Sequence, residues 1–174
     1  MARNSKMAEG LYRTPEVQSD DVFSLSDIAH ILNVPEARLK RCTSGSYQVV
    51  RKLLNNSGER PTGFYSLDDL YLFALVNHMR DLKLAKEAVE LVVEEIFVKS
   101  DLPYARIAFH RKGDTWNLDW GFCNDMPWNE FRAEENPPAT SPKIEYELDV
   151  ASLVGWVNGR VQAQMKGKVH PCTR

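Results

Sequence analysis

The residues with the clearest chemical capacity are six basic side chains in the short stretch 36–60, which also holds two acidic residues and so carries a net charge of +4. Arginine and lysine bind backbone phosphates and guanine edges in DNA. This cluster therefore predicts a contact with DNA, and the alternative for each side chain is a solvated surface charge. Tyr65 is added as a candidate base contact, although a core position that braces the neighbouring loop is the more common role. The predicted DNA-binding residues are Arg38, Lys40, Arg41, Arg51, Lys52, Arg60 and Tyr65.

The opposite charge gathers further along the chain. Residues 114–150 contain nine acidic and two basic residues, a net charge of -7, whereas the whole chain carries -2. This polarity suits a basic binding segment joined to an acidic body. The alternative is an ordinary fluctuation of charge along a chain.

Other chemistries find little support in the residue pattern. The three cysteines (Cys42, Cys123, Cys172) form no CxxC pair, and the four histidines are scattered. A disulfide framework and a metal site are therefore not expected. The chain also lacks a glycine-rich phosphate loop and a nucleophile elbow, so we expect neither an enzyme nor a bound cofactor.

Length and hydropathy set the broad class. A chain of 174 residues with 43% hydrophobic and 26% charged residues is typical of a globular protein of one or two small domains. No run approaches the roughly 18 apolar residues of a membrane-spanning helix. Residues 1–10 are polar and lack the apolar core of a secretion signal, which predicts a cytoplasmic location.

The basic residues belong to a predicted pair of helices. Ser24 can cap a helix that runs to Leu32, with Asp27 placed as in a capping box. A second helix is predicted from Pro35 to Cys42, with Leu39 facing inward and the cations facing elsewhere. Residues 47–54 could form a helix or a strand, and residues 55–58 form a turn.

The remaining elements follow from periodicity. A helix that is apolar around most of its girth starts at Ser66. Another covers about residues 84–98, with Ala85, Val89, Val92 and Ile96 on its inward side. Beyond residue 101 the period changes to two, which predicts a hairpin with one aromatic face and a third strand at 144–148. A last helix starts at Asp149 or Ser152, and its apolar residues share one side: Val150, Leu153, Val154, Val157, Val161 and Met165. The predicted fold class is α+β.

Three segments resemble the MerR-type winged helix-turn-helix family. They are FSLSDIA at 23–29, NVPEARLKR at 33–41 and FYSLDDL at 64–70, and the resemblance covers residues 22–98. It implies a recognition helix at 35–42, a wing at 55–63 and binding to double-stranded DNA. The family's aromatic residues after the Leu-Arg pair are replaced here by Arg41 and Cys42, and its long dimer helix is missing. A metal-sensing or drug-sensing role is therefore not carried over.

Together these features predict a flexible arm (1–21), a MerR-like DNA-binding domain (22–100), an α+β domain for dimerisation or partner binding (101–167) and a flexible tail (168–174). The expected function is a sequence-specific transcriptional regulator that binds DNA as a homodimer. One alternative is a protein-interaction module that keeps the winged fold without binding DNA. Another is a phage-type DNA packaging or excision factor.

The aromatic residues of the second half have two interpretations. They could line a ligand pocket, or they could form a core between a strand face and the last helix, which is the more common arrangement. We expect the core. The residues concerned are Trp116, Trp120, Trp128, Phe131 and Trp156.

Overall fold

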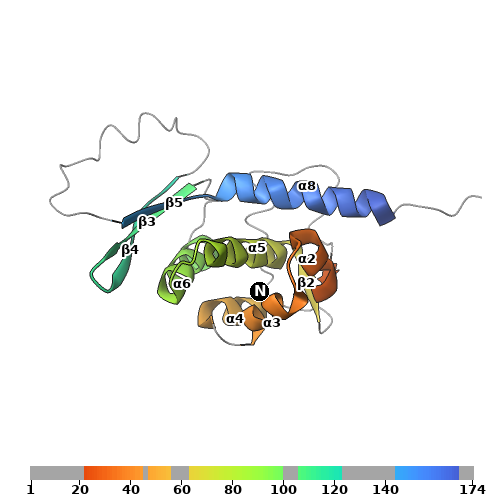
Figure 1. Ribbon diagram of the computed structural model, residues 1–174, viewed down its shortest axis with the longest axis horizontal. Coiled ribbons are helices and arrows are strands. Elements are labelled where there is room, and N and C mark those ends of the chain that lie inside the picture. Colours follow the sequence, from red (N-terminus) through yellow and green to blue (C-terminus); the bar gives the residue numbers. More distant parts are fainter. Residues whose placement is uncertain (1–21, 45–46, 56–62, 100–105, 123–143, 169–174) are drawn as a thin grey trace, which may run out of the picture.

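The computed structural model describes residues 22–44, 47–55, 63–99, 106–122 and 144–168 (Figure 1). The described chain mixes helices with small antiparallel sheets, which agrees with the predicted α+β class. Several predictions fall outside the described residues. They are the arm at 1–21, most of the wing with Arg60, the boundary at 101–103, the loop at 123–142 and the tail beyond 168.

Two short strands connect the starts of two helices. Strand β1 (Val22–Ser24) pairs antiparallel with β2 (Phe64–Ser66), and each strand leads directly into a helix, α2 (Leu25–Leu32) or α5 (Leu67–Asp81). The predicted capping box at α2 is confirmed, because Asp27 N–H donates to Ser24 Oγ at 3.1 Å and Ser24 N–H donates to Asp27 Oδ2 at 3.0 Å. Ser66 and Asp69 repeat this arrangement at α5. Because the pairing is antiparallel, with Ser24 opposite Phe64 and Ser66 opposite Val22, the two helices leave this ladder at opposite ends.

A tight turn joins α2 to α3 (Glu36–Thr43). Asn33 adopts a left-handed conformation with φ 54°, which asparagine tolerates better than most residues, and its N–H donates to His30 O at 3.2 Å. Pro35 is the N-cap residue, so the helix begins one residue later than predicted. Leu39 and Cys42 are buried, as the prediction of an inward-facing Leu39 requires.

The segment that the sequence left open between helix and strand is a helix, α4 (Gln48–Asn55). Val50 and Leu53 are buried on its inner side. The Glu90 carboxylate of α6 (Lys86–Glu94) accepts a hydrogen bond of 2.6 Å from Gln48 N–H. A contact with a distant helix therefore supplies a cap that the local sequence lacks.

Helix α5 occupies the centre of the molecule. Eleven of its fifteen residues are buried, as its apolar girth predicts. Figure 1 shows it between α8 (Val150–Lys168) on one side and α3 on the other. Helix α6 follows and continues as a π-helical turn, η1 (Glu95–Lys99), with the predicted inward residues Val89, Val92 and Ile96 buried.

The second sheet has the strand order β4–β3–β5 and is antiparallel throughout. Its strands are β3 (Arg106–Lys112), β4 (Thr115–Phe122) and β5 (Ile144–Asp149), so the predicted hairpin and third strand are confirmed. Phe109 stacks on Tyr146 with ring centroids 5.5 Å apart, and Trp116 packs against both rings. The register shifts between Ala108 and Phe109, which interrupts the strict alternation expected along β4.

The last helix, α8, packs against α5 and α2 as well as contacting β3. Tyr71 O–H donates to Asn158 Oδ1 at 2.6 Å, and Arg160 donates to the carbonyl oxygen of Ile31 at the end of α2. Val150, Val154, Val157 and Val161 lie inward, as predicted. The buried apolar cluster consequently continues from the first helices into the second sheet.

We expect Tyr71→Phe to lower the free energy of unfolding near neutral pH by about 1–2 kcal/mol, because the buried hydrogen bond to Asn158 is lost. Burial raises the pKa of the Tyr71 hydroxyl from 10.0 to about 12. Folding therefore favours the protonated hydroxyl, and wild-type stability falls as pH rises through this interval. Urea unfolding should show the gap between wild type and variant narrowing over the same interval. Tyr146→Phe is the control, and an equal loss there would contradict the prediction.

A second expectation concerns the inner side of α3. Leu39→Ala should lower the free energy of unfolding by about 2–5 kcal/mol, because Leu39 is fully buried and its removal leaves a cavity. The neighbouring Lys40→Ala should change it by less than about 0.5 kcal/mol, since Lys40 is exposed. Thermal and urea unfolding measure both. Similar losses for the two variants would show that α3 is not anchored through Leu39.

Candidate nucleic-acid interface

Helix α3 has an apolar inner side and a basic outer side. Leu39 and Cys42 are buried beneath it, whereas Ala37, Lys40 and Arg41 are exposed. Burial raises the pKa of the Cys42 thiol, although the nearby Arg80 guanidinium opposes this shift. The thiol therefore acts as a packed apolar group. On the opposite side of the helix, the exposed Lys40 and Arg41 are available to a partner.

Lys40 forms an exposed ion pair within its own helix. Its ammonium group lies 2.8 Å from the Glu36 carboxylate one turn away, and its side chain is 65% exposed. Such exposed ion pairs contribute little to stability and exchange readily. Arg41 is also exposed, and no ion pair holds it within the described residues. A phosphate group can thus reach both side chains without breaking the fold.

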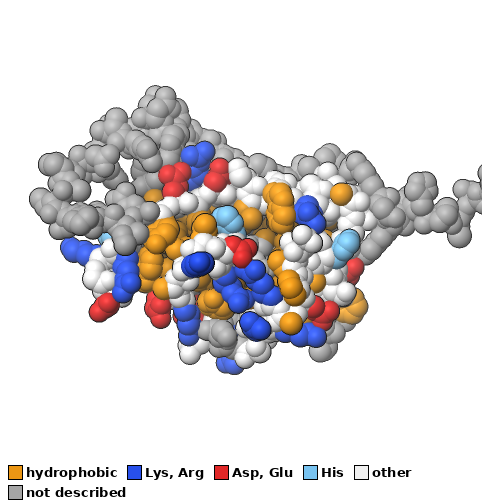
Figure 2. Space-filling model, viewed as in Figure 1, with side chains coloured by type: hydrophobic (Ala, Val, Ile, Leu, Met, Phe, Trp, Pro, Cys, Tyr) orange, Lys and Arg blue, Asp and Glu red, His pale blue; other side chains and the backbone are white. Residues whose placement is uncertain are grey.

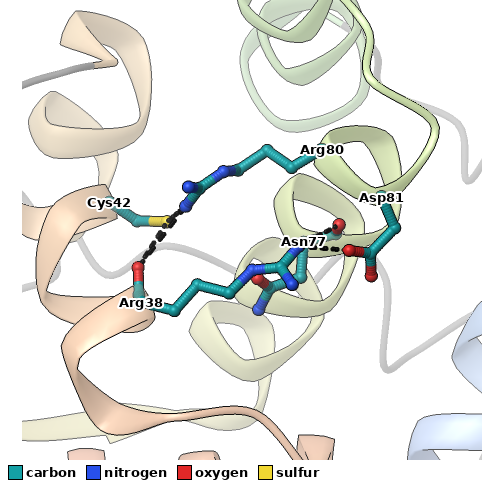
Figure 3. Close-up of polar contacts among 5 residues, drawn as sticks. All are labelled: Arg38, Cys42, Asn77, Arg80 and Asp81. Atoms are coloured by element: carbon teal, nitrogen blue, oxygen red, sulfur yellow. Dashed lines mark hydrogen bonds and ion pairs between the residues drawn. The ribbon is translucent and has the colours of Figure 1, made fainter.

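Arg38 lies differently from the two cations beside it. Its Nη2 atom is 2.6 Å from Asp81 Oδ1 and donates to Asn77 O at 3.2 Å, so the side chain extends to the end of α5 (Figure 3). The sequence placed Arg38 on the same front as Lys40 and Arg41. The structure separates Arg38 from Lys40, because residues 38 and 40 are about 200° apart around a helix, whereas Arg41 lies nearly one turn from Arg38 on the same flank.

Helix α4 adds two more of the predicted cations. Arg51 and Lys52 are exposed, while Val50 and Leu53 face the core. Since α4 contacts α3, the two helices present their basic side chains on neighbouring surfaces. Figure 2 shows Lys and Arg side chains gathered over α3, α4 and the space between α3 and α5.

Of the two remaining predicted DNA-binding residues, Tyr65 is described by the structure and Arg60 is not. Tyr65 is half-buried, and its ring meets the Phe73 ring edge-on with a centroid distance of 5.3 Å. This contact ties Tyr65 to α5, while most of the loop that it was expected to brace lies outside the described residues. Arg60 lies outside the described residues.

Three residues near this surface were missed by the sequence reasoning. Asn77, Arg80 and Asp81 lie in the last turns of α5, and Arg80 Nη1 contacts Arg38 O at 3.5 Å and Cys42 Sγ at 3.8 Å. A signal did exist. Polar residues spaced by three and four at the end of an apolar helix share one face, and that face must meet a polar neighbour.

The aromatic residues of the second half do not meet in one place. Trp116 packs with Phe109 and Tyr146 and is partly buried against the core, but strand β4 contacts α6, whereas the expected partner was the last helix. Trp156 is 46% exposed on α8, with the Arg160 guanidinium 5.2 Å above its ring, which differs from a core position. The side chain of Trp120, and Trp128 and Phe131, lie outside what the structure describes.

The described residues also bear on a metal site and on a membrane span. No three His, Cys, Asp or Glu side chains there converge as ligands for a metal ion. Among the helices in these ranges, none combines the length and the apolar character needed to cross a membrane.

With this geometry established, the chain was compared with known proteins. Models of protein families, curated protein sequences and solved structures gave no match.

Proposed function

We propose that this protein is a sequence-specific regulator of transcription that binds double-stranded DNA through the outer face of α3. The observation that carries the proposal is the exposure of Lys40 and Arg41 on a short helix whose opposite side is anchored by buried Leu39 and Cys42. A reading helix needs this combination, because its packed side fixes the direction of the side chains that touch the duplex.

The dimensions of α3 fit such a role. A helix with its side chains is about 10–12 Å in diameter, and the major groove of B-DNA is about 12 Å wide. Lys40 and Arg41 would contact guanine edges or phosphates, and Arg51 and Lys52 would contact the adjacent backbone. In the finer form of the proposal, the arrangement is a MerR-like winged helix-turn-helix, with residues 55–63 as the wing and Arg60 on it. The short turn between α2 and α3 and the pairing of β1 with β2 support that form.

The proposal includes a homodimer acting in the cytoplasm. DNA readers of this size commonly bind paired half-sites as symmetric dimers, which doubles the contact area. Residues 101–167 would supply the dimer contact or recruit a protein partner.

A second candidate function is a protein-interaction module that does not bind DNA. The exposed indole of Trp156 favours it, because large exposed aromatic side chains are enriched at protein interfaces. Arg38 also favours it, since an ion pair with Asp81 already engages this member of the basic cluster. A DNA packaging or excision factor would share the DNA-binding surface.

The test begins with a duplex selected from a random pool by the full chain. Fluorescence anisotropy then measures its affinity over a range of salt concentrations. Replacing both Lys40 and Arg41 with alanine should reduce the slope of log affinity against log salt by up to about two, because each lost phosphate contact removes about one released counterion. Lys112→Ala, an exposed lysine at the end of β3, is the matched control and should leave the slope unchanged.

Three results would redirect the assignment. Unchanged affinity in the Lys40/Arg41 double variant would show that α3 is not the reading helix. A chain with no duplex affinity at low salt would support the interaction module. Strong bending of the selected duplex, seen as a position-dependent shift in gel mobility, would favour a packaging or excision factor.

A further inference from the structure

A cavity lies between the start of α3 and the end of α5, on the flank of the proposed reading helix. Its volume is about 410 Å³, and it is lined by Pro35, Ala37, Arg38, Arg41, Arg80 and Asp81. Figure 3 shows the Arg38 and Arg80 side chains crossing between the two helices in opposite directions. The cavity is therefore bounded by side chains from two elements far apart in the sequence.

The lining is strongly cationic. Three guanidinium groups face one carboxylate, and guanidinium stays charged at any accessible pH. The negative charge of Asp81 is paired with Arg38 Nη2. The positive charges of Arg41 and Arg80 are therefore less neutralised than that of Arg38. Arg80 Nη1 contacts a carbonyl oxygen at 3.5 Å and a thiol at 3.8 Å rather than an anion.

Hydrogen-bond donors at the cavity are incompletely used. Arg38 Nε is buried and has no acceptor within the described residues. The N-cap residue of α3 is Pro35, which makes no side-chain cap, so the first N–H groups of the helix have no capping side chain. The positive end of the helix dipole adds to the same potential. Buried donors normally have partners, so the buried Arg38 Nε–H points to an acceptor in this cavity.

We infer that this cavity binds one phosphate group, held by Arg41 and Arg80 beside the start of α3. Arginine forks match the spacing of phosphate oxygens, which makes arginine the preferred partner of this anion. Arg38 would take part through its buried Nε–H while Asp81 holds its other end. The phosphate could belong to the DNA backbone or to a free phosphate, and the first source rests on the proposed function.

Asp81 has a definite part in this site. Its carboxylate lies at the cavity wall and repels an incoming anion, yet it also orients Arg38. Because the Asp81 side chain is 62% exposed, its replacement by asparagine preserves the shape with little risk to folding. A change in phosphate affinity in this variant then distinguishes the two roles of Asp81. Affinity rises if Asp81 repels a bound anion, whereas breaking a purely structural ion pair would not raise it.

The first arm of the test titrates the full chain with inorganic phosphate, with potassium chloride keeping the ionic strength constant. Nitrogen–proton spectra of the arginine Nε–Hε groups follow the site directly. We expect saturable shifts at Arg38, Arg41 and Arg80. Asp81→Asn should tighten phosphate binding about fivefold by removing a nearby like charge. Arg80→Gln should weaken it about tenfold by removing a charged donor.

Asp114→Asn, the same chemical change on the exposed turn between β3 and β4, is the matched control and should leave the affinity unchanged. If Arg80→Gln does not fold, the wild-type titration and Asp81→Asn decide the matter. Absence of saturable arginine shifts, or equal affinities in Asp81→Asn and Asp114→Asn, would overturn the phosphate site.

The second arm uses the selected duplex and separates the sources of phosphate. A tighter duplex affinity in Asp81→Asn, together with loss of the inorganic phosphate signal when the duplex is added, would identify a backbone phosphate. Saturation by inorganic phosphate with duplex affinity unaffected by Asp81→Asn would identify a free phosphate. Phosphate binding without duplex affinity would support this site and overturn the proposed function. Duplex binding without phosphate binding would support the proposed function and overturn the phosphate site.

Discussion

Burial of α5 is the constraint around which the other elements are arranged. Apolar side chains cover nearly its whole circumference, so removing them from water requires partners on every side. Helices α6 and α8, strands β1 and β2 and the inner side of α3 provide these partners. This requirement brings the last helix of the chain back to the first ones, where Tyr71 bonds to Asn158 and Arg160 bonds to the end of α2. The polar residues of α5 are thereby confined to its two ends.

That confinement shapes the basic surface. At the C-terminal end of α5, Asn77, Arg80 and Asp81 meet α3, and Arg38 is drawn toward them. A helix turns by about 100° per residue, so Arg38 and Lys40 cannot share a side of α3. The basic cluster of the sequence therefore becomes two sets of cations in space. One set faces solvent from α3 and α4, and the other surrounds a cavity between helices.

The two sets support two distinct modes of anion recognition. Exposed cations on a rigid helix suit the edges and backbone of a duplex, where many weak contacts add up. Cations around a cavity suit a single phosphate group, where fixed geometry matters more than number. Arg41 belongs to both sets, since it is exposed and also lines the cavity. A net charge of -2 for the chain does not oppose either mode, because the positive charges are gathered on neighbouring elements.

Features encoded in a few adjacent residues were determined by the sequence alone. These include the capping box of Ser24 and Asp27, the buried Leu39, the hairpin and the inward valines of the last helix, because capping and periodicity are local signals. Tertiary structure decided whether residues 48–55 form a helix, where the register of β4 shifts and which distant groups Arg38 contacts. Those outcomes depend on partners far along the chain: Arg38 and Asp81 are 43 residues apart, and Arg160 and Ile31 are 129 apart. No local pattern specifies such pairs, since they form only when the burial of α5 has fixed the relative positions of the helices.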